Sequence, residues 1–190
     1  MPAASEVFIS VDVETAGPHP GSHALLSIGA CLALEPDKTF YVELQPDREA
    51  AVPEALAISG LSLGGLAEYG VPPAEAMAQF KVWTLEQTPP GARPVFVAFN
   101  APFDWMFVAE YFHRYLGRNP FGHSALDLKA FYMGLTGAPW SETALHHVAA
   151  RYGCRQELAH HALSDAQDQA ALFRAMLAEA RQRGWDWIPD

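Results

Sequence analysis

Four acidic residues and one histidine stand in three short segments whose order and spacing suit the binding of divalent metal ions. Asp12 and Glu14 lie in VFISVDVET, Asp104 lies in VFVAFNAPFD, and His160 and Asp165 lie in HHALSDAQD. Each carboxylate stands at the end of an apolar run or beside the expected start of a helix, where an acidic side chain rarely occurs without a cationic partner. The pattern therefore predicts a divalent-metal site and phosphoryl-transfer chemistry.

The first segment places two carboxylates on one face of a predicted strand. Residues 6–13 are nearly all apolar, as in a strand that is buried on both faces. Because side chains alternate along a strand, Asp12 and Glu14 point to the same side, where their charges repel in poorly hydrated surroundings. A divalent cation resolves both problems. In the alternative interpretation, the strand ends at Val11 and both acids are solvated loop residues.

The second carboxylate follows another predicted strand. Residues 94–99 form an apolar run, a short turn begins at Asn100, and a helix is expected over 102–116. Asp104 falls in the first turn of that helix, where the helix dipole favours a negative charge. Helix capping is therefore its alternative role, and Asn100 can hold the turn by local hydrogen bonding.

The third segment combines a carboxylate with two histidines. Asp165 lies near the start of a helix expected over 164–183, with Ser164 as a suitable N-cap. His160 precedes this helix in a loop. A histidine there can act as a general base, because imidazole titrates near neutral pH. On composition alone, His161 competes for the same role.

The elements that position these residues alternate along the chain. Strands are predicted at 6–13, 25–34, 39–44 and 94–99, and helices at 53–59, 72–87, 102–116, 125–133, 141–152 and 164–183. Three early strands followed by alternating helix and strand favour an α/β fold in which a mixed sheet is flanked by helices on both faces. With 190 residues and no linker or repeat, one domain is expected.

Composition excludes several classes of protein. Half of the residues are hydrophobic and no apolar run is long enough to span a membrane, so a soluble, cytoplasmic protein is expected. A formal net charge of −10 argues against wrapping long duplex DNA but permits a short nucleic-acid site. Cys31 and Cys154 form no paired motif and are expected to be buried free thiols.

Taken together, the three segments resemble the sequence motifs of one enzyme family. DVET at 12–15 matches a DxE motif, NAPFD at 100–104 matches NxxFD, and HHALSDA at 160–166 matches HxAxxDA. The chain is thus similar to the DnaQ-like 3′→5′ exonucleases of the DEDDh type, which have a ribonuclease H-like fold. The resemblance implies one exonuclease domain over 1–190, with a core from about 6 to 177 and a tail at 184–190 packed on it.

The resemblance also implies a mechanism with two Mg²⁺ or Mn²⁺ ions per site. Asp12 would bridge the two ions. Glu14 and Asp165 would complete the coordination of the ion beside the attacking water, and Asp104 would hold the ion beside the leaving group. In this alignment His160 is the general base and His161 occupies a variable position. The products would be nucleoside 5′-monophosphates. Phe99 is a departure, because many members carry His or Gly before the second-motif Asn.

The same resemblance implies a set of substrate contacts. The resemblance places the backbone of Thr15 and Ala16 at the terminal sugar, and Asn100 and Phe103 are further candidates for substrate binding. The expected partner is single-stranded or short nucleic acid, either RNA or DNA, because no motif reads the 2′-hydroxyl. A homodimer is also expected from similar enzymes, through the apolar segment 60–67 or the C-terminal tryptophans.

Aromatic and basic side chains provide a wider set of candidates. Bases could stack on Phe103, Trp105, Phe107, Tyr132 or Trp140, and phosphates could be held by Arg114, Arg118, Lys129, Arg151 or Arg155. For each aromatic the alternative is core packing, and for each cation it is a solvated surface position.

Two other functions compete with the exonuclease interpretation. A zinc hydrolase could draw on eight histidines, but His19 and His23 lie in a Gly/Pro-rich loop and no HExxH motif is present. A non-catalytic nucleic-acid-binding module on the same fold is the second alternative. It would be indicated by loss of a carboxylate, whereas all four are present.

Overall fold

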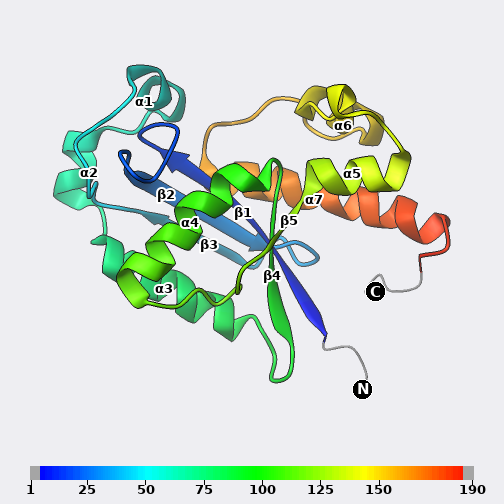
Figure 1. The fold of residues 1–190 in the computed structure, drawn as a ribbon, viewed down its shortest axis with the longest axis horizontal. Helices are drawn as coiled ribbons and strands as arrows, with labels where there is room; N and C mark the ends of the chain where they lie inside the picture. The colour runs from blue at the N-terminus through cyan, green and yellow to red at the C-terminus, as the bar shows by residue number, and fades with distance from the viewer. Residues whose placement is uncertain (1–4, 186–190) are drawn as a thin grey trace.

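Five strands form one mixed sheet in the order β3-β2-β1-β4-β5. The computed structural model describes residues 5–185 (Figure 1). The strands are β1 Glu6–Thr15, β2 Leu25–Leu32, β3 Thr39–Glu43, β4 Arg93–Ala98 and β5 Ala125–Asp127. β2 is antiparallel to β1 and to β3, whereas β4 is parallel to β1 and to β5. The expected mixed sheet flanked by helices is therefore confirmed.

Seven α-helices and one 3₁₀ turn are found among the described residues. They are α1 Pro53–Ser59, α2 Leu63–Tyr69, α3 Pro73–Glu86, α4 Ala101–Leu116, α5 Leu128–Thr136, the 3₁₀ turn Trp140–Glu142, α6 Leu145–Tyr152 and α7 Ala162–Gln182. Proline in the first turn begins α1, α3 and α4, where its missing N–H costs nothing. The chain leaves α4 and α5 through Gly117 and Gly137, which both have positive φ.

Several predicted boundaries are wrong. β1 continues past residue 13 to Thr15, so Asp12 and Glu14 lie within the strand. Residues 125–133 do not form one helix: 125–127 pair with β4 as strand β5, and α5 begins at Leu128. The helix expected from 141 begins at Leu145 after the 3₁₀ turn. α7 begins at Ala162, so Ser164 is not its N-cap.

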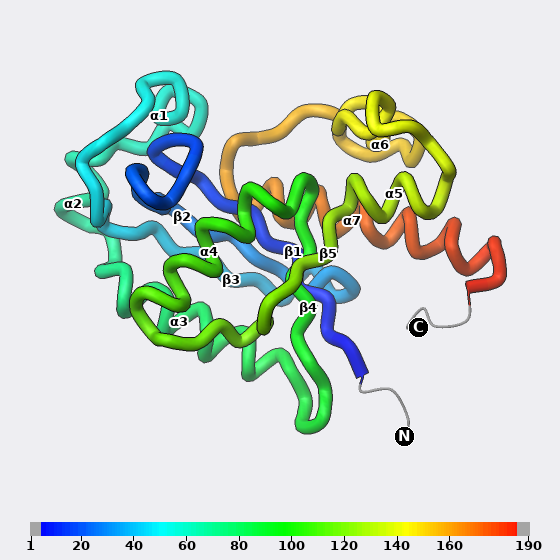
Figure 2. The backbone as a smooth tube through the Cα atoms, in the orientation of Figure 1, coloured from blue at the N-terminus to red at the C-terminus, as the bar shows by residue number. Residues whose placement is uncertain are grey.

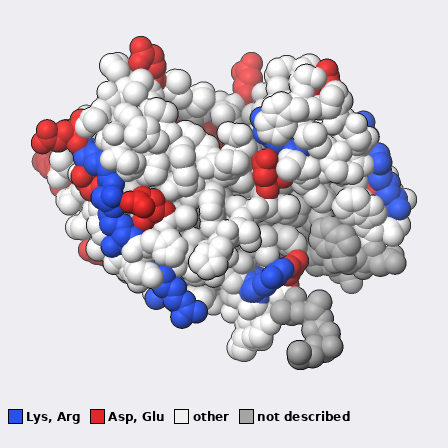
Figure 3. All heavy atoms as spheres, viewed as in Figure 1, with Lys and Arg blue, Asp and Glu red and all other residues white. Residues whose placement is uncertain are grey.

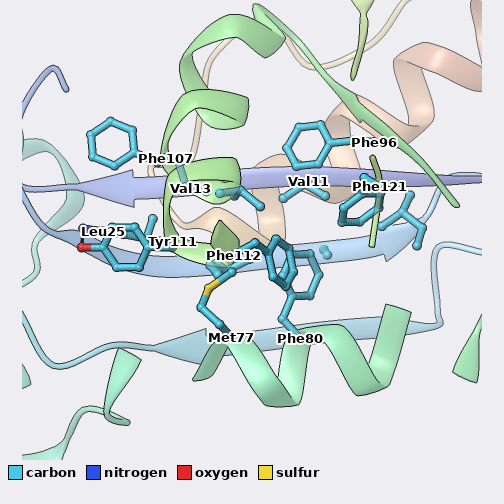
Figure 4. Packing of buried hydrophobic residues seen from close by; sticks show 14 of the residues in the cluster. Val11, Val13, Leu25, Met77, Phe80, Phe96, Phe107, Tyr111, Phe112 and Phe121 are labelled. Atoms are coloured by element: carbon cyan, nitrogen blue, oxygen red, sulfur yellow. Dashed lines mark hydrogen bonds between the residues drawn. The ribbon is translucent and has the colours of Figure 1, made fainter. Parts of the chain in front are cut away.

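One face of the sheet packs against α3 and α4. Alternation along β1 sends Ile9, Val11 and Val13 to this face. They meet a cluster that includes Phe80 of α3 and Phe112 of α4 (Figure 4). This packing fixes α4, and with it Asp104, against β1.

The opposite face packs against α7. Phe8 of β1 lies edge-on to Phe173 of α7, with ring centroids 5.2 Å apart. The same cluster extends to Tyr132 of α5 and Val148 of α6. The even-numbered residues of β1 therefore face α7, and so do Asp12 and Glu14.

Other expectations have mixed outcomes. Cys31 is buried and Cys154 is half-buried, and both are free thiols. The predicted tail lies largely outside the described residues, as does Trp187, but Trp185 packs edge-on against Phe131 with ring centroids 6.0 Å apart. Across residues 5–185, no helix has the length and apolar character needed to cross a bilayer.

Candidate active site

The carboxyl end of β1 supplies two of the carboxylates. β1 pairs with β4 only as far as Ser10, because β4 ends at Ala98. Beyond that point the edge of β1 is open, and Asp12 and Glu14 project beside it on the face that α7 covers. Ligand sites in open α/β sheets commonly lie at such carboxyl ends.

Asp104 closes this open edge from α4. Its side chain is buried, and Oδ1 accepts a hydrogen bond from the Val13 N–H at 3.2 Å. The preceding turn holds Asn100 at φ 64°, a left-handed conformation that asparagine tolerates better than most residues. The first-turn position that the sequence predicted for Asp104 thus brings it directly to β1.

α7 carries Asp165 to the same place because its N-terminus lies very close to the sheet. Gly29 of β2 stands opposite Asp12. A Cβ atom at Gly29 would lie 2.1 Å from the backbone nitrogen of Leu163. The Ser10 hydroxyl donates a hydrogen bond of 2.8 Å to the carbonyl of Ala166, which fixes the first turn of α7 against β1.

The loop before α7 presents His160. Asp165 Oδ1 accepts a hydrogen bond from the Ala159 N–H at 2.7 Å, and Oδ2 accepts one from the His161 N–H at 3.3 Å. His160 itself has φ 56°, in the left-handed region. This strained conformation is held by the two hydrogen bonds on either side of it.

These residues surround one pocket of about 440 Å³. The ligand atoms of Asp12, Glu14 and Asp165 all lie within 4.8 Å of one another. The lining residues are Asp12, Val13, Glu14, Phe99, Asn100, Phe103, Asp104, Lys129, Ala144, Leu145, Leu158, His160, Asp165 and Gln169. All four predicted carboxylates and His160 are therefore brought together, whereas His161 does not line the pocket.

Crowding and burial make the site unfavourable for negative charge. Burial, and then the neighbouring carboxylates Asp104, Asp165 and Glu14, raise the pKa of Asp12 well above its usual range. Burial and then Asp165 raise the pKa of Glu14 to about 7. Burial raises the pKa of Asp104 to about 8, although hydrogen bonds from backbone N–H groups oppose the shift. A divalent cation would relieve this repulsion, and an all-oxygen donor set suits Mg²⁺ or Mn²⁺.

Two polar residues that the sequence analysis missed support the carboxylates. Gln169 Nε2 donates to Asp12 Oδ1 at 2.6 Å, and its Oε1 accepts from the Phe99 N–H at 2.8 Å. Asp127 Oδ1 accepts from the N–H groups of Ala101 and Lys129, so it joins the starts of α4 and α5. The sequence contained only weak indications of these two roles. Gln169 lies one helical turn after Asp165, and Asp127 precedes a helix as an N-cap residue does.

The substrate-binding candidates separate into two groups. Asn100 and Phe103 line the pocket. Thr15 and Ala16 are buried and do not line it, and the Thr15 hydroxyl donates to the Gly17 carbonyl at 2.9 Å.

Most of the other candidates are engaged elsewhere. Phe107 and Tyr132 are buried, and Trp105 packs edge-on against Phe96. Arg114, Arg151 and Arg155 pair with Glu110, Glu179 and Asp168 respectively. Arg118 does not line the pocket. Lys129 lines it and lies beside the exposed Trp140.

Two named proteins are similar to the chain over most of its length. It is 48% identical to the 3′-5′ DNA exonuclease Cap18 of Escherichia coli over 169 residues, covering 89% of this chain and 90% of Cap18. It is 32% identical to ribonuclease T of Salmonella typhimurium, covering 93% of this chain and 87% of that enzyme. No family model matches the sequence.

Solved structures have the same fold. The nuclease domain of 3′hExo, a DEDDh family member bound to rAMP, superimposes with a TM-score of 0.72 at 12% identity, over 97% of this chain and 96% of that one. Exonuclease I of E. coli in complex with a dT13 oligonucleotide superimposes with the same TM-score of 0.72, at 19% sequence identity. The match covers 94% of this chain but only 42% of exonuclease I. The mixed sheet is thus that of the ribonuclease H-like exonucleases.

Proposed function

Because the chain belongs to the DnaQ-like family of 3′→5′ exonucleases, we propose that it degrades single-stranded or short DNA from the 3′ end to nucleoside 5′-monophosphates. The observation that carries the proposal is the convergence of Asp12, Glu14, Asp104 and Asp165 with His160 around one pocket. Four carboxylates without a metal would repel a phosphodiester, so their presence favours metal-dependent hydrolysis over simple binding.

The four carboxylates would hold the catalytic cations. Asp12, Glu14 and Asp165 can share one Mg²⁺ or Mn²⁺, because their oxygens lie within 4.8 Å of one another. Asp104, which reaches the same pocket from α4, would contribute to a second. When bound, the ions would supply positive charge and Lewis acidity for the attack on the phosphate and for departure of the 3′-oxygen.

His160 would act as the general base. It lines the pocket from the loop side, and a water molecule between it and the scissile phosphate could give up its proton to the imidazole. The hydrogen bonds from the N–H groups of Ala159 and His161 to Asp165 fix the backbone of His160 beside the carboxylates. Positioning of this kind lowers the entropic cost of the attack.

The terminal nucleotide would occupy the pocket between α4 and the loop before α7. Phe103 is half-buried and rests on Phe107 at 5.6 Å between ring centroids, so its ring offers a rigid surface to a base or sugar. Asn100 offers polar atoms at the same wall. Thr15 and Ala16 would act only through their backbone.

DNA is proposed rather than RNA because the relative with 48% identity is named a DNA exonuclease, whereas the ribonuclease T match is at 32%. The test is digestion of end-labelled DNA and RNA oligonucleotides of matched sequence with Mg²⁺, with Mn²⁺ and with EDTA. We expect DNA to be shortened faster than RNA, from a free 3′-hydroxyl, with no activity in EDTA.

A DNA strand blocked by a 3′-phosphate provides the control for polarity. Cuts in a circular single strand, or full activity in EDTA, would contradict the proposal. Faster digestion of RNA would retain the mechanism and reassign the substrate.

A homodimer is proposed as well. Within the suggested segment 60–67, Leu66 is buried inside the chain, while Ser62 and Ala67 are exposed. Light scattering after size-exclusion chromatography measures the mass directly, and a mass of one chain would exclude the dimer.

A further inference from the structure

Lys129 and Trp140 form a cation–π pair at the border of the active-site pocket. Lys129 lines the pocket, and its ammonium nitrogen lies 4.2 Å from the centroid of the Trp140 ring. Ala144 and Leu145, which follow the 3₁₀ turn that carries Trp140, line the same wall. The pair is therefore continuous with the catalytic pocket but lies outside its ring of carboxylates.

The Lys129 ammonium is the sole lysine or arginine charge among the residues that line the pocket within 5–185. Several other cations of the molecule are paired with carboxylates, as Arg151 is with Glu179 and Arg155 with Asp168. No such carboxylate lies within 4.0 Å of Lys129 in the described chain. Its charge is thus available to a phosphate.

Trp140 is exposed in a way that core packing does not explain. Its side chain is 57% exposed, although tryptophan usually buries most of its surface. The backbone beneath it is tied to the body of the protein, because the Thr143 hydroxyl donates to the Trp140 carbonyl at 2.8 Å and Thr143 is buried. An exposed indole beside an ammonium that no carboxylate neutralises is a combination that binds single-stranded nucleic acid.

We propose that Trp140 and Lys129 form a subsite for the strand upstream of the scissile phosphate, in which a base stacks on the indole and Lys129 contacts a backbone phosphate. The subsite rests on the proposed exonuclease function and extends it to how the strand is held. Stacking on Trp140 is sequence-tolerant because every base has a π-face. The cation near the ring adds charge attraction where the net charge of −10 would otherwise repel the strand.

The test compares substrates that do and do not reach the subsite. The p-nitrophenyl ester of thymidine 5′-monophosphate carries one nucleotide, whereas a series of oligothymidylates extends from two to ten. For Trp140→Ala we expect KM for the longer oligonucleotides to rise about 5- to 100-fold, with the ester unaffected. Trp140→Phe keeps a ring and should restore most of the loss. Tyr69→Ala removes a similarly exposed aromatic that does not line the pocket and should change nothing.

Lys129 is tested by the salt dependence of binding. Anisotropy of a labelled ten-nucleotide strand, measured in an Asp104→Asn background that prevents cleavage, gives the slope of log K against log salt concentration. Removal of one phosphate contact by Lys129→Gln should flatten this slope by about 0.7, the value for single strands. Lys81→Gln on α3 is the matched control.

The outcomes distinguish failure of the proposed subsite from failure of the proposed exonuclease function. If the wild-type protein hydrolyses neither the ester nor the oligonucleotides, the proposed function fails. If the wild type is active but Trp140→Ala lowers activity equally on the ester and on every oligonucleotide, the role of Trp140 is structural and the subsite is wrong. The subsite is also wrong if Trp140→Ala leaves KM unchanged for oligothymidylates of every length.

Discussion

At the scale of single residues, Asp165 links the proposed metal-binding cluster to the proposed base. One of its oxygens lies within 4.8 Å of a ligand oxygen of Asp12 and of Glu14, and the two oxygens accept hydrogen bonds from the N–H groups of Ala159 and His161. The left-handed backbone of His160 lies between these two groups. One carboxylate would thus hold the proposed cations and also shapes the loop that presents the imidazole, so its loss would affect both.

The two adjacent histidines differ sharply in their surroundings, which permits a clear prediction. His160 lines the pocket, while the His161 ring stacks on Tyr41 with centroids 4.7 Å apart. His160→Ala should lower kcat about 10²- to 10⁴-fold, the usual contribution of a positioned general base, with binding retained. His161→Ala keeps the N–H that Asp165 accepts, so it should cost far less. Steady-state kinetics on a labelled oligonucleotide provide the measurement.

The reverse order of effects would mean that the third motif is aligned one residue out of register. Asp165 would then need reassignment together with the histidine, because both were placed by the same motif.

At the scale of elements, the site depends on how closely α7 approaches the sheet. Gly29→Ala would place a Cβ atom 2.1 Å from the Leu163 nitrogen, and backbone cannot yield as a flexible side chain can. We expect a loss of stability of about 1–3 kcal/mol, typical of overpacking, and a displaced Asp165. Activity should therefore fall further than the loss of folded protein explains. Chemical denaturation measures the loss of stability, and kcat under conditions in which the variant is fully folded measures the loss of activity.

Gly134→Ala is the matched control for this prediction. It lies inside α5, where an added Cβ atom meets nothing within 4 Å, so the substitution should be neutral or slightly stabilising. Equal damage from both variants would show that the close approach of α7 is not what matters.

The elements that the sequence predicted well are those with strong local patterns. The apolar run of β1 and the long helix α4 were located from the sequence, although β1 extends two residues further than predicted, because burial on a sheet face or a helix stripe is a local property of the sequence. β5 was missed because it has only three residues and exists through its pairing with β4. Helix α2 was missed as well, since a Gly-Gly pair lies within its seven residues.

The candidate site shows the same division. The carboxylates could be predicted because charged residues in apolar segments stand out. Gln169 could not, because a glutamine on a long helix ordinarily faces solvent, and only the tertiary fold sets it 2.6 Å from Asp12. Lys129 and Trp140 were among many candidates of each kind, and the structure distinguishes Trp140 by its exposure and Lys129 by the pocket that it lines.

At the scale of the whole molecule, the chain lacks a broad basic surface on the face shown in Figure 3. Lys and Arg side chains lie there in small separate groups, most of them close to Asp or Glu. In Figure 2 the segment between α6 and α7 runs from α6 to the start of α7 near β1, and Leu158 and His160 of this segment line the acidic pocket. The proposed binding of an anionic strand would therefore rely on cations held by the carboxylates and on few local contacts. This arrangement suits a short substrate.

The same concentration of acid predicts how stability depends on pH and on metal. In the metal-free protein, burial and neighbouring carboxylates raise the pKa of Glu14 from 4.5 to about 7 and that of Asp104 from 3.8 to about 8. Between the unfolded and folded values, the folded state binds more protons than the unfolded state. The free energy of unfolding should therefore fall as the pH rises from about 4.5 to about 8.

Divalent metal should reverse this loss of stability, which gives the last prediction. At pH 8, Mg²⁺ or Mn²⁺ at about 100 times its dissociation constant should stabilise the fold by about 2.7 kcal/mol. For a domain of this size, this corresponds to a rise in Tm of about 5–10 °C. At pH 5 the effect should be smaller, because protons compete for the same oxygens. Thermal unfolding with and without metal at the two pH values measures the effect.

Asp104→Asn, which removes one of the repelling charges, should weaken both the pH dependence and the response to metal. If Tm of the metal-free wild type rises from pH 5 to 8, or if metal changes Tm equally in both proteins, the four carboxylates do not form the electrostatically coupled site described above.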